Sequence, residues 1–400
     1  MRLIFVNRYY WPDESATSLM LTDLAVALAA RGHQVRVLTS RQTIDDAGAR
    51  LPDVECAAGV TIERLYSSRF GRARLAGRAV DYFTFYLSVL WRLMRSLRRD
   101  DVVIAKTDPP LISVVSSLAA GLRRAHLVNW LQDVYPEVAV RLGVFSAGSP
   151  LTQLLTRLRN HSLRRAQVNV VVGERMRAHL HALLPGLPVA VIHNWSADLA
   201  STPAPQDDNP YRQQLNLADK TVFAYSGNLG RAHRFDALLA AGERLKERSD
   251  LAVLIIGGGA QFEPLRQQAQ ARNLSNWHFL PYQPRAQLGV SLGAADVHLV
   301  SLEAALEGLI VPSKLYGILA AGRPAIYLGD AAGETAQILL AEGCGRVAGD
   351  DAAMLEQIML ELAQDAPLRL RMGAAALRAS GERYSRAHAV AQWEHLLAAL

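Results

Sequence analysis

The residues with the clearest chemical signature lie in the segment LEGLIVPSKLYGILAAGRPAIYLG, where one lysine interrupts a mostly apolar run. Lys314 directly follows the Pro312-Ser313 turn and begins a helical pattern that continues through Leu315. We expect Ser313 to cap this helix and Lys314 to extend outward from it. A lysine at the positive end of a helix dipole is unfavourable alone, and a bound anion would remove that conflict. The pattern therefore favours a phosphate-binding turn over the alternative, a solvated lysine at a helix start.

Two glycine-rich turns each connect a predicted strand to a predicted helix. The first lies in AYSGNLGRAHRFDALLAA and the second in LIIGGGAQFEPLRQQA. The candidate binding residues in these turns are Gly227, Asn228, Leu229, Gly230, Gly257 and Gly258. Glycine leaves the backbone bare, so a phosphate can approach the free N–H groups at a helix N-terminus. Neither turn is a complete dinucleotide or Walker motif, and the alternative for each is a purely structural turn.

Three nitrogen-bearing side chains follow the first glycine turn. We place Arg231, His233 and Arg234 on the first turn of the helix that comes after Gly230. Arg231 and Arg234 are three residues apart, so on a helix they would share one face. Because arginine can bind two phosphate oxygens at once, these two side chains would supply positive charge to an anion.

The elements that position these residues follow a repeated strand–helix pattern, which is typical of parallel α/β sheets. The predicted strands are LIFVN, QVRVLTS, VTIERL, DVVIAK, HLVNWL, VNVVVG and VAVIHN, then TVFAYSG, AVLIIGGG, NWHFLPY, DVHLVSL, PAIYLGD and GCGRVAG. A chain of 400 residues is too long for one ordinary core. The segment WSADLASTPAPQDDNPY has no periodicity and is the best linker. We expect a doubly wound domain over 1–195, a linker over 196–212, a second such domain over 213–380, and a helix over 381–400 that packs back on the first domain.

Composition narrows the class of protein. With 50% hydrophobic and 20% charged residues the chain is globular, and its two cysteines lie far apart without a metal or redox spacing. The apolar stretches fall short of the roughly 20 residues that a membrane-spanning helix needs. The apolar stretch near the N-terminus is too short for the core of a signal peptide. We therefore expect a cytoplasmic protein that binds no metal.

Together these segments resemble glycosyltransferase family 4, whose members use nucleotide sugars and have the GT-B fold of two Rossmann-like domains. The resemblance is to the branch found in bacterial O-antigen, colanic-acid and exopolysaccharide clusters. It rests on YYWPDESATSLMLTDLAVALAARGHQVRVLTS, NWLQDVYPEVAVRLG, VIHNWSADL, YSGNLGRAHRFDALL, LIIGGGAQ and VPSKLYGILAAGRPAI. It implies that the first domain takes the acceptor and the second binds the donor. It also implies transfer with retention of the anomeric configuration.

Residue by residue, the resemblance implies that the SGNLG turn and the Ser313-Lys314 turn hold the nucleotide diphosphate. Breaking the bond between sugar and phosphate leaves negative charge on the diphosphate, which Lys314 and Arg231 would stabilise as catalytic residues. No clustered Asp-x-Asp or His/Cys set is present, so we expect metal-independent transfer without a cofactor. The nucleotide sugar is a substrate, and a UDP-sugar is preferred over a GDP-sugar.

The chain departs from the family pattern at three positions. Most members have an arginine and a lysine where this chain has Asn228 and His233, and a ribose-binding glutamate where it has Gly317. In the family this glutamate is one of a pair of acids, and Glu307 is the candidate for the other acid. Arg231 and Arg234 then supply the missing charge, and His233 is secondary. We predict that Arg231→Ala loses more activity than His233→Ala.

Several residues are assigned to the acceptor and the nucleotide base. Asp133, in NWLQDVYPE, follows a buried-looking strand, and we expect it to orient or deprotonate the acceptor hydroxyl, with a simple turn cap as the alternative. Glu137 is a weaker candidate for this role. Tyr282 either lines the base pocket or packs as an ordinary aromatic residue. The closure loop, Pro12 to Thr17, contains Glu14, Ser15, Ala16 and Thr17 and is expected to close on the donor, with Glu14 near sugar hydroxyls.

A basic, aromatic segment lies in the first half. Between Arg64 and Arg99 nine arginines stand against one acid, Asp81. We propose peripheral contact with an anionic membrane for Arg72, Arg74, Arg78, Trp91 and Arg92. The alternatives are a core helix with a solvated basic flank and, less favoured, nucleic-acid binding.

The sequence therefore predicts a glycosyltransferase that moves a sugar from a nucleotide sugar to a lipid-linked saccharide in cell-surface polysaccharide (lipopolysaccharide or exopolysaccharide) biosynthesis. Two alternatives stay open. One is a nucleotide-sugar 2-epimerase of GT-B shape, and the other is a non-catalytic protein with a degenerate nucleotide site.

Overall fold

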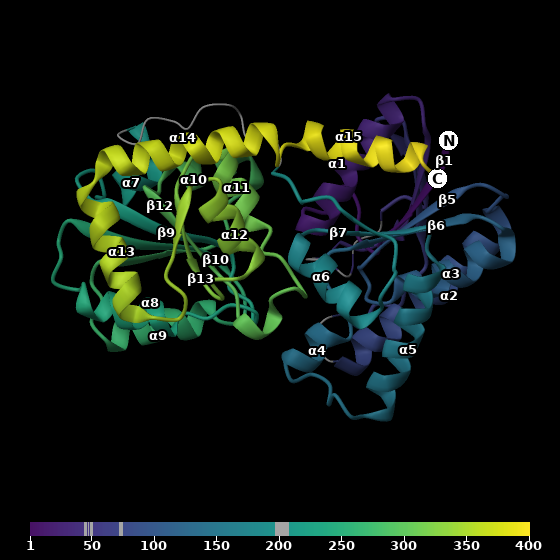
Figure 1. Ribbon diagram of the computed structural model, residues 1–400, viewed down its shortest axis with the longest axis horizontal. Coiled ribbons are helices and arrows are strands. Elements are labelled where there is room, and N and C mark those ends of the chain that lie inside the picture. The colour runs from purple at the N-terminus through teal and green to yellow at the C-terminus, as the bar shows by residue number, and fades with distance from the viewer. Residues whose placement is uncertain (44–45, 47, 49–50, 72–74, 197–207) are drawn as a thin grey trace. The chain divides into compact units, whose positions relative to one another are not determined.

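The computed structural model describes residues 1–43, 46, 48, 51–71, 75–196 and 208–400. The described chain divides into two compact units (Figure 1). Unit 1 comprises Met1–His193 and Ala389–Leu400, and unit 2 comprises Asn194–His388. Each unit is built on one largely parallel sheet, as the alternation of strands and helices predicts. No helix in the described part of the chain is both long and apolar enough to cross a membrane.

The sheet of unit 1 has eight strands. Their order across the sheet is β3 (Val54–Ala57), β4 (Val60–Leu65), β2 (Gln34–Ser40), β1 (Arg2–Val6), β5 (Val102–Lys106), β6 (His126–Leu131), β7 (Val168–Val171) and β8 (Val189–Val191). All neighbours are parallel except β3 and β4, which form a hairpin over Ala58 and Gly59, both at positive φ. The strand order reverses between β1 and β5, and ligands of open α/β sheets bind at the carboxyl ends of strands at such a switch point.

Unit 1 also contains helices. They are α1 (Ala16–Ala30), α2 (Leu75–Ser96), α3 (Ile112–Arg123), α4 (Glu137–Arg141), α5 (Pro150–Arg165), α6 (Glu174–Leu183) and the part of α15 (Arg386–Ala398) from residue 389 onward. Phe85, Val89 and Leu93 of α2 recur at helical spacing and pack with α3 against β1, β5 and β6. In α15, Trp393 packs edge-on against Trp130 of β6, with ring centroids 5.0 Å apart.

The sheet of unit 2 has six strands, all parallel. Their order is β11 (Trp277–Leu280), β10 (Leu251–Gly258), β9 (Thr221–Asn228), β12 (Val297–Ser301), β13 (Ala325–Leu328) and β14 (Gly345–Val347). The helices are α7 (Pro210–Gln214), α8 (Asp236–Arg244), α9 (Phe262–Ala271), α10 (Leu288–Gly293), α11 (Lys314–Ala320), α12 (Glu334–Ala341), α13 (Ala352–Gln364) and α14 (Ala366–Glu382). The switch point lies between β9 and β12, so these two strand ends are where a ligand is expected.

Candidate active site

Lys314, the first residue of α11, lies beside the switch point of unit 2. Its Nζ atom is 3.5 Å from the centroid of the Tyr225 ring on β9. The side chain also lies against the glycine turn, since a Cβ atom added to Gly227 would be 3.6 Å from Cε and 3.9 Å from Nζ of the lysine. Nζ is shielded from solvent and has no hydrogen-bond partner among the residues that the structure describes. Burial lowers the pKa of Lys314 well below its ordinary value.

Two expectations about this turn are wrong. Lys314 does not extend outward but folds inward onto Tyr225. Ser313 makes no side-chain capping hydrogen bond and has helical backbone angles, φ −64° and ψ −21°. An extended backbone is what lets a capping residue reach back to the helix N–H groups, so a helical Ser313 cannot do so. The first turn of α11 therefore keeps its N–H groups free of a serine cap.

The two glycine turns pack directly against each other. A Cβ atom on Gly257, at φ +146°, would lie 2.0 Å from the carbonyl oxygen of Gly227, and one on Gly259 would lie 2.3 Å from Oδ1 of Asn228. Across the turns, the amide of Leu229 donates to the carbonyl of Gly258 at 2.7 Å. The second turn therefore supports the first, and close backbone contact alone explains why residue 257 is glycine.

The segment after Gly230 differs from the expected helix. Helix α8 begins only at Asp236, so Arg231 and Arg234 do not share a helix face, and that part of the argument is wrong. Residues 231–235 form an irregular loop because Nε2 of Gln261 donates to the carbonyls of Gly230 at 2.6 Å and His233 at 2.7 Å. These bonds hold the backbone in a loop that the local sequence does not predict.

The three side chains of this loop have different surroundings. Arg231 is exposed, and Arg234 pairs with Glu303 at 3.2 Å and Asp236 at 3.5 Å. Nδ1 of His233 is 2.5 Å from the carbonyl oxygen of Ser301. Burial, followed by the charge of Lys314, lowers the pKa of His233 to about 3. The imidazole is therefore neutral at ordinary pH, and the charge of Arg234 is already compensated by carboxylates.

The remaining donor-side residues of unit 2 are placed as follows. The Glu307 carboxylate accepts hydrogen bonds from the Tyr327 hydroxyl and from the amide of Glu334 at the start of α12, and burial raises its pKa. Tyr282 is 58% exposed, and its hydroxyl donates to the carbonyl of Gly258 at 3.4 Å. The side chains of Leu229, Pro312 and Leu315 are buried, which leaves only their backbone groups for a ligand.

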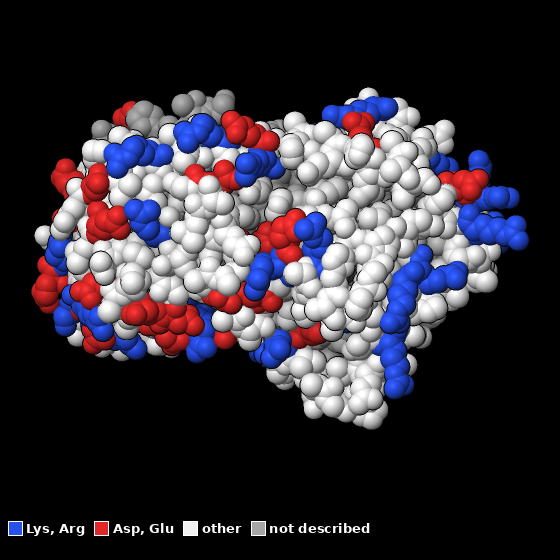
Figure 2. Space-filling view, viewed as in Figure 1, with Lys and Arg blue, Asp and Glu red and all other residues white. Residues whose placement is uncertain are grey.

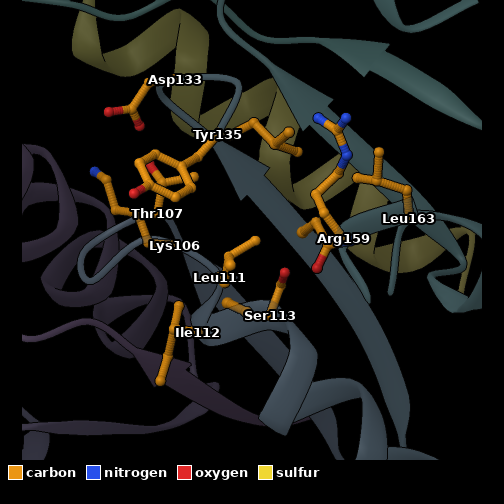
Figure 3. A pocket seen from close by; sticks show the side chains of 12 residues that line it. Lys106, Thr107, Leu111, Ile112, Ser113, Asp133, Tyr135, Arg159 and Leu163 are labelled. Atoms are coloured by element: carbon orange, nitrogen blue, oxygen red, sulfur yellow. The ribbon is translucent and has the colours of Figure 1, made fainter. Parts of the chain in front are cut away.

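In unit 1, Asp133 lies two residues beyond the end of β6 and lines a small pocket (Figure 3). The same pocket is lined by Lys106, Thr107, Tyr135 and Arg159, which come from or follow β5, β6 and α5. Burial raises the pKa of Asp133, while a hydrogen bond with Thr107 and the charge of Lys106 act in the opposite direction. The role of general base stays a prediction for this carboxyl group.

The other acids of unit 1 are not part of this pocket lining. Glu137, the weaker candidate, pairs with Arg159 at 2.5 Å. Glu14 is exposed in the closure loop. In that loop the Asp13 carboxylate accepts a hydrogen bond from the amide of Ser15 at 2.9 Å, and Ala16 begins α1. The carbonyl of Thr17 accepts a hydrogen bond from Lys106 at 3.0 Å, which joins the loop to β5.

Residues 75–96 of the basic segment form α2. Arg72 and Arg74 lie outside the described residues. Arg78 is half-buried, and Nε of Arg92 binds the Glu63 carboxylate. Trp91 is exposed, with the Arg95 guanidinium 4.5 Å above its ring.

The residues with clear contacts at these sites that were not identified from the sequence include Tyr225, Gln261, Ser301 and Lys106. Tyr225 stands two positions before Gly227 on the same strand, so strand alternation could have indicated it. Lys106 ends a strand in a chain with only four lysines, which was also a usable signal. Nothing local marks Gln261 or Ser301, because their partners come from other elements.

Comparison with known proteins decides the family. Residues 17–195 match the model of the glycosyl transferase 4-like domain, and residues 207–378 match that of glycosyl transferases group 1. The probable glycosyltransferase WbjE of Pseudomonas aeruginosa is 31% identical over 273 residues, which cover 67% of each chain. This chain belongs to glycosyltransferase family 4. The glycosyltransferase is also 28% identical over 352 residues to WcaI of Escherichia coli K12, a putative colanic acid biosynthesis glycosyl transferase, covering 84% of this chain and 86% of WcaI.

Solved structures show the fold of the glycosyltransferase. Sucrose-phosphate synthase from Thermosynechococcus elongatus matches with a TM-score of 0.78 at 17% identity, over 100% of both chains. Anabaena Alr3699/HepE, in complex with UDP, matches with 0.74 at 16% identity over 100% of both chains. WaaG, a glycosyltransferase involved in lipopolysaccharide biosynthesis, matches with 0.71 at 16% identity over 99% of both. The predicted GT-B class is therefore confirmed, and family membership favours the transferase over the epimerase and the non-catalytic alternatives.

Among the described residues, no group of three or more His, Cys, Asp or Glu side chains could hold a metal ion. Metal independence is still a prediction about the reaction. So is the greater importance of Arg231 over His233.

Proposed function

We propose that this glycosyltransferase moves a sugar from a nucleotide diphosphate sugar, with UDP as the preferred nucleotide, to a lipid-linked saccharide. The reaction proceeds with retention, needs no metal ion, and serves bacterial cell-surface polysaccharide biosynthesis. The names of the relatives WbjE and WcaI and the UDP bound to HepE support the reaction class and the nucleotide. The residues of the two units support the individual roles.

The observation that carries the proposal is the buried ammonium group of Lys314. A charge removed from water without a counter-ion is costly, by several kcal/mol in real proteins. The ring face of Tyr225 offsets only part of that cost, since cation–π contacts contribute about 2 kcal/mol when desolvated. A diphosphate seated on the bare Gly227 turn would supply the missing partner and restore the full charge of the lysine. Such a lysine is poised to stabilise the leaving group.

The neutral state of His233 fits the same role. Its Nδ1 lies 2.5 Å from the Ser301 carbonyl oxygen, so in the neutral ring Nδ1 carries the proton and Nε2 is left as an acceptor. A second cation this close to Lys314 would repel the ammonium group and destabilise the protein without bound nucleotide. The family lysine that is absent at 233 is thus replaced by a group that leaves Lys314 as the cation beside the Gly227 turn.

Asp133 supplies the acceptor side of the proposal. Its carboxyl group is buried at a strand end, beside a threonine and a lysine that favour the ionised form. An ionised carboxylate of raised basicity is suited to accept a hydrogen bond from an acceptor hydroxyl and to take its proton.

A thermal-shift panel with UDP, GDP, CMP, dTDP and their sugars tests nucleotide binding. A ligand at 100 times its Kd stabilises the folded state by about 2.7 kcal/mol, so the matching nucleotide raises Tm by several degrees. Lys314→Met should abolish this shift. Lys246→Met, the same change at an exposed lysine of unit 2, is the matched control and should keep it. Equal shifts in both variants would remove Lys314 from the donor site.

Transfer is tested with the nucleotide sugar selected by that panel and a synthetic lipid-linked saccharide. Lys314→Ala should slow transfer about 10²-fold, by analogy with loss of one oxyanion donor. NMR of the product determines the anomeric configuration, and activity in EDTA tests metal independence. Inverted product, or activity lost in EDTA and restored by a divalent cation, would contradict that part of the proposal.

We further propose that unit 1 contacts an anionic membrane through α2, α3 and α5. Large apolar side chains are exposed along these helices: Phe83, Leu87, Trp91, Leu118, Leu122, Leu151, Leu154 and Leu158. Basic side chains gather over α5 and near the ends of α2 and α3, while unit 2 shows both signs (Figure 2). An apolar face with arginines at its edge suits the headgroup region of an anionic bilayer.

Flotation with phosphatidylglycerol and phosphatidylcholine vesicles tests this surface. The glycosyltransferase should float with the anionic vesicles alone, and added salt should weaken binding. The double variant Leu87→Ser/Trp91→Ser should remain in the soluble fraction. Leu370→Ser/Leu377→Ser, on the exposed face of α14 in unit 2, is the control. Equal flotation of both double variants would leave α2 as a core helix with a solvated flank.

A further inference from the structure

A lysine at the switch point of unit 1 has contacts that the transfer reaction, as described so far, does not use. Lys106 is the last residue of β5, next to β1 where the strand order reverses, and it is 1% exposed. The chain has 43 basic residues, of which only four are lysines. Two of these four, Lys106 and Lys314, lie over aromatic rings at the two switch points. Most basic residues of this chain are arginines, so a buried lysine at each switch point distinguishes both sites.

The contacts of Lys106 join three elements. Its Nζ atom donates to the carbonyl of Thr17 in the first turn of α1, at 3.0 Å. It also lies 3.6 Å from the ring centroid of Trp130 on β6. The ammonium group is thus fixed between the closure loop on one side and the strand that leads to Asp133 on the other.

Three carboxylates, each from a different part of unit 1, act on the charge of this lysine. Asp23 of α1, Asp108 after β5 and Asp133 after β6 each favour its charged form, while burial lowers its pKa well below the ordinary value. Lys106 and Asp133 lie on the same side of the pocket, and the carboxylate and Nζ face the same region (Figure 3). Arg159 lines the same pocket and is paired with Glu137.

Tyr135 also lines this pocket. Burial raises its pKa to about 12, so it is neutral at ordinary pH. Of the groups that affect Asp133, Thr107 is neutral and Lys106 is the cation that favours its ionised form.

We propose that Lys106 is a positioning residue that holds the closure loop, through Thr17, and the carboxylate of Asp133 in one arrangement for the acceptor. This inference deepens the proposed function and rests on it. Lys106 acts through Thr17, which accepts a hydrogen bond from its Nζ, and through Asp133, whose carboxylate faces the same region of the pocket (Figure 3). Lysine suits the place because a compact ammonium on a flexible stem fits between a carbonyl and a ring, which a planar guanidinium does not.

The first experiment compares pH profiles of kcat/KM for the parent, Lys106→Met, Lys106→Arg and the exposed control Lys246→Met. Because the charge of Lys106 favours the ionised form of Asp133, Lys106→Met should move the acidic limb upward by about one pH unit. The KM for the acceptor should rise in Lys106→Met, because the closure loop loses its tie, while the Kd for UDP is unchanged. Lys106→Arg should recover the position of the acidic limb but not the acceptor KM. An acidic limb that stays in place in folded Lys106→Met overturns the proposal.

The second experiment does not depend on activity. With lysine labelled at ¹³Cε, the chain gives only four side-chain signals, and single Lys→Arg variants assign them. Asp133→Asn should lower the pKa of Lys106 and leave that of Lys314 unchanged, since coupling between two sites is reciprocal. A Lys106 titration that is unaffected by Asp133→Asn overturns the arrangement.

The two experiments also separate this inference from the proposed function. Coupling between Lys106 and Asp133 together with full transfer activity of Asp133→Asn would refute the role of Asp133 as base, and with it the proposed positioning. Absence of coupling with normal nucleotide binding would refute the positioning role alone.

Discussion

Replacing Lys314 with methionine should stabilise unit 2 while it abolishes nucleotide binding. The lysine amine is buried against Tyr225 and has no hydrogen-bond partner among the described residues. Methionine has a similar length, carries no charge and makes favourable sulfur–aromatic contacts. The variant therefore removes an uncompensated buried charge and keeps the packing on the ring.

The magnitude follows from the pKa of Lys314. In the unfolded chain the lysine has its ordinary pKa, and in the folded chain burial lowers that pKa well below 10.5. The unfolded state therefore binds more protons between the two values, so the free energy of unfolding rises with pH across that window. Each unit of lowering costs the parent about 1.4 kcal/mol at pH values below the folded pKa. The gain from Lys314→Met should be greatest at low pH and should vanish as pH approaches the ordinary pKa of lysine.

Calorimetry of the parent and Lys314→Met between about pH 6 and pH 9 measures this difference. The relevant transition is the one that the matching nucleotide shifts in the parent, and Lys246→Met controls for loss of an exposed lysine. A variant that is less stable than the parent throughout this range, or a difference that does not change with pH, would refute a buried lysine without a counter-ion.

Two further predictions concern the glycine turn and the loop that follows it. Gly257→Ala should destabilise unit 2 by about 1–3 kcal/mol and abolish nucleotide binding, because its Cβ would collide with the Gly227 carbonyl. Gly289→Ala is the control, since a Cβ atom at Gly289 would have open space around it. Equal melting temperatures of the two variants would contradict the packing of the two turns. Arg231→Ala should lower kcat/KM more than Arg234→Ala, because the latter guanidinium is already paired with carboxylates. Steady-state kinetics with one nucleotide sugar measures this order, and the reverse order would show that Arg234 exchanges its carboxylates for phosphate.

Much of the architecture is legible in the sequence. Short runs rich in β-branched residues are typical of strands, and β2, β4 and β6 have the bounds predicted from QVRVLTS, VTIERL and HLVNWL. The hairpin strand β3 was not predicted, because VECA is short, half-exposed and carries a glutamate. Its pairing with β4 comes from the turn at Ala58 and Gly59.

Fewer of the candidate site residues could be predicted from the sequence. Lys314 stands out because a charge within an apolar run has no local explanation, and Asp133 because it follows a buried strand. Family membership, which the motifs predicted, is confirmed by the matches over both units. These inferences use only neighbours along the chain and the known place of strand ends in a sheet.

The tertiary structure decides where the side chains of the candidate site point and which groups they contact. Whether Lys314 points outward or inward depends on Tyr225, which β9 brings beneath α11. The late start of α8 depends on Gln261, whose amide holds the preceding loop open. Lys106 gains its significance from Thr17 and Trp130, which lie on other elements. Local propensity acts over a few residues, whereas the burial of a charge and the identity of its partners are set only when distant segments pack together.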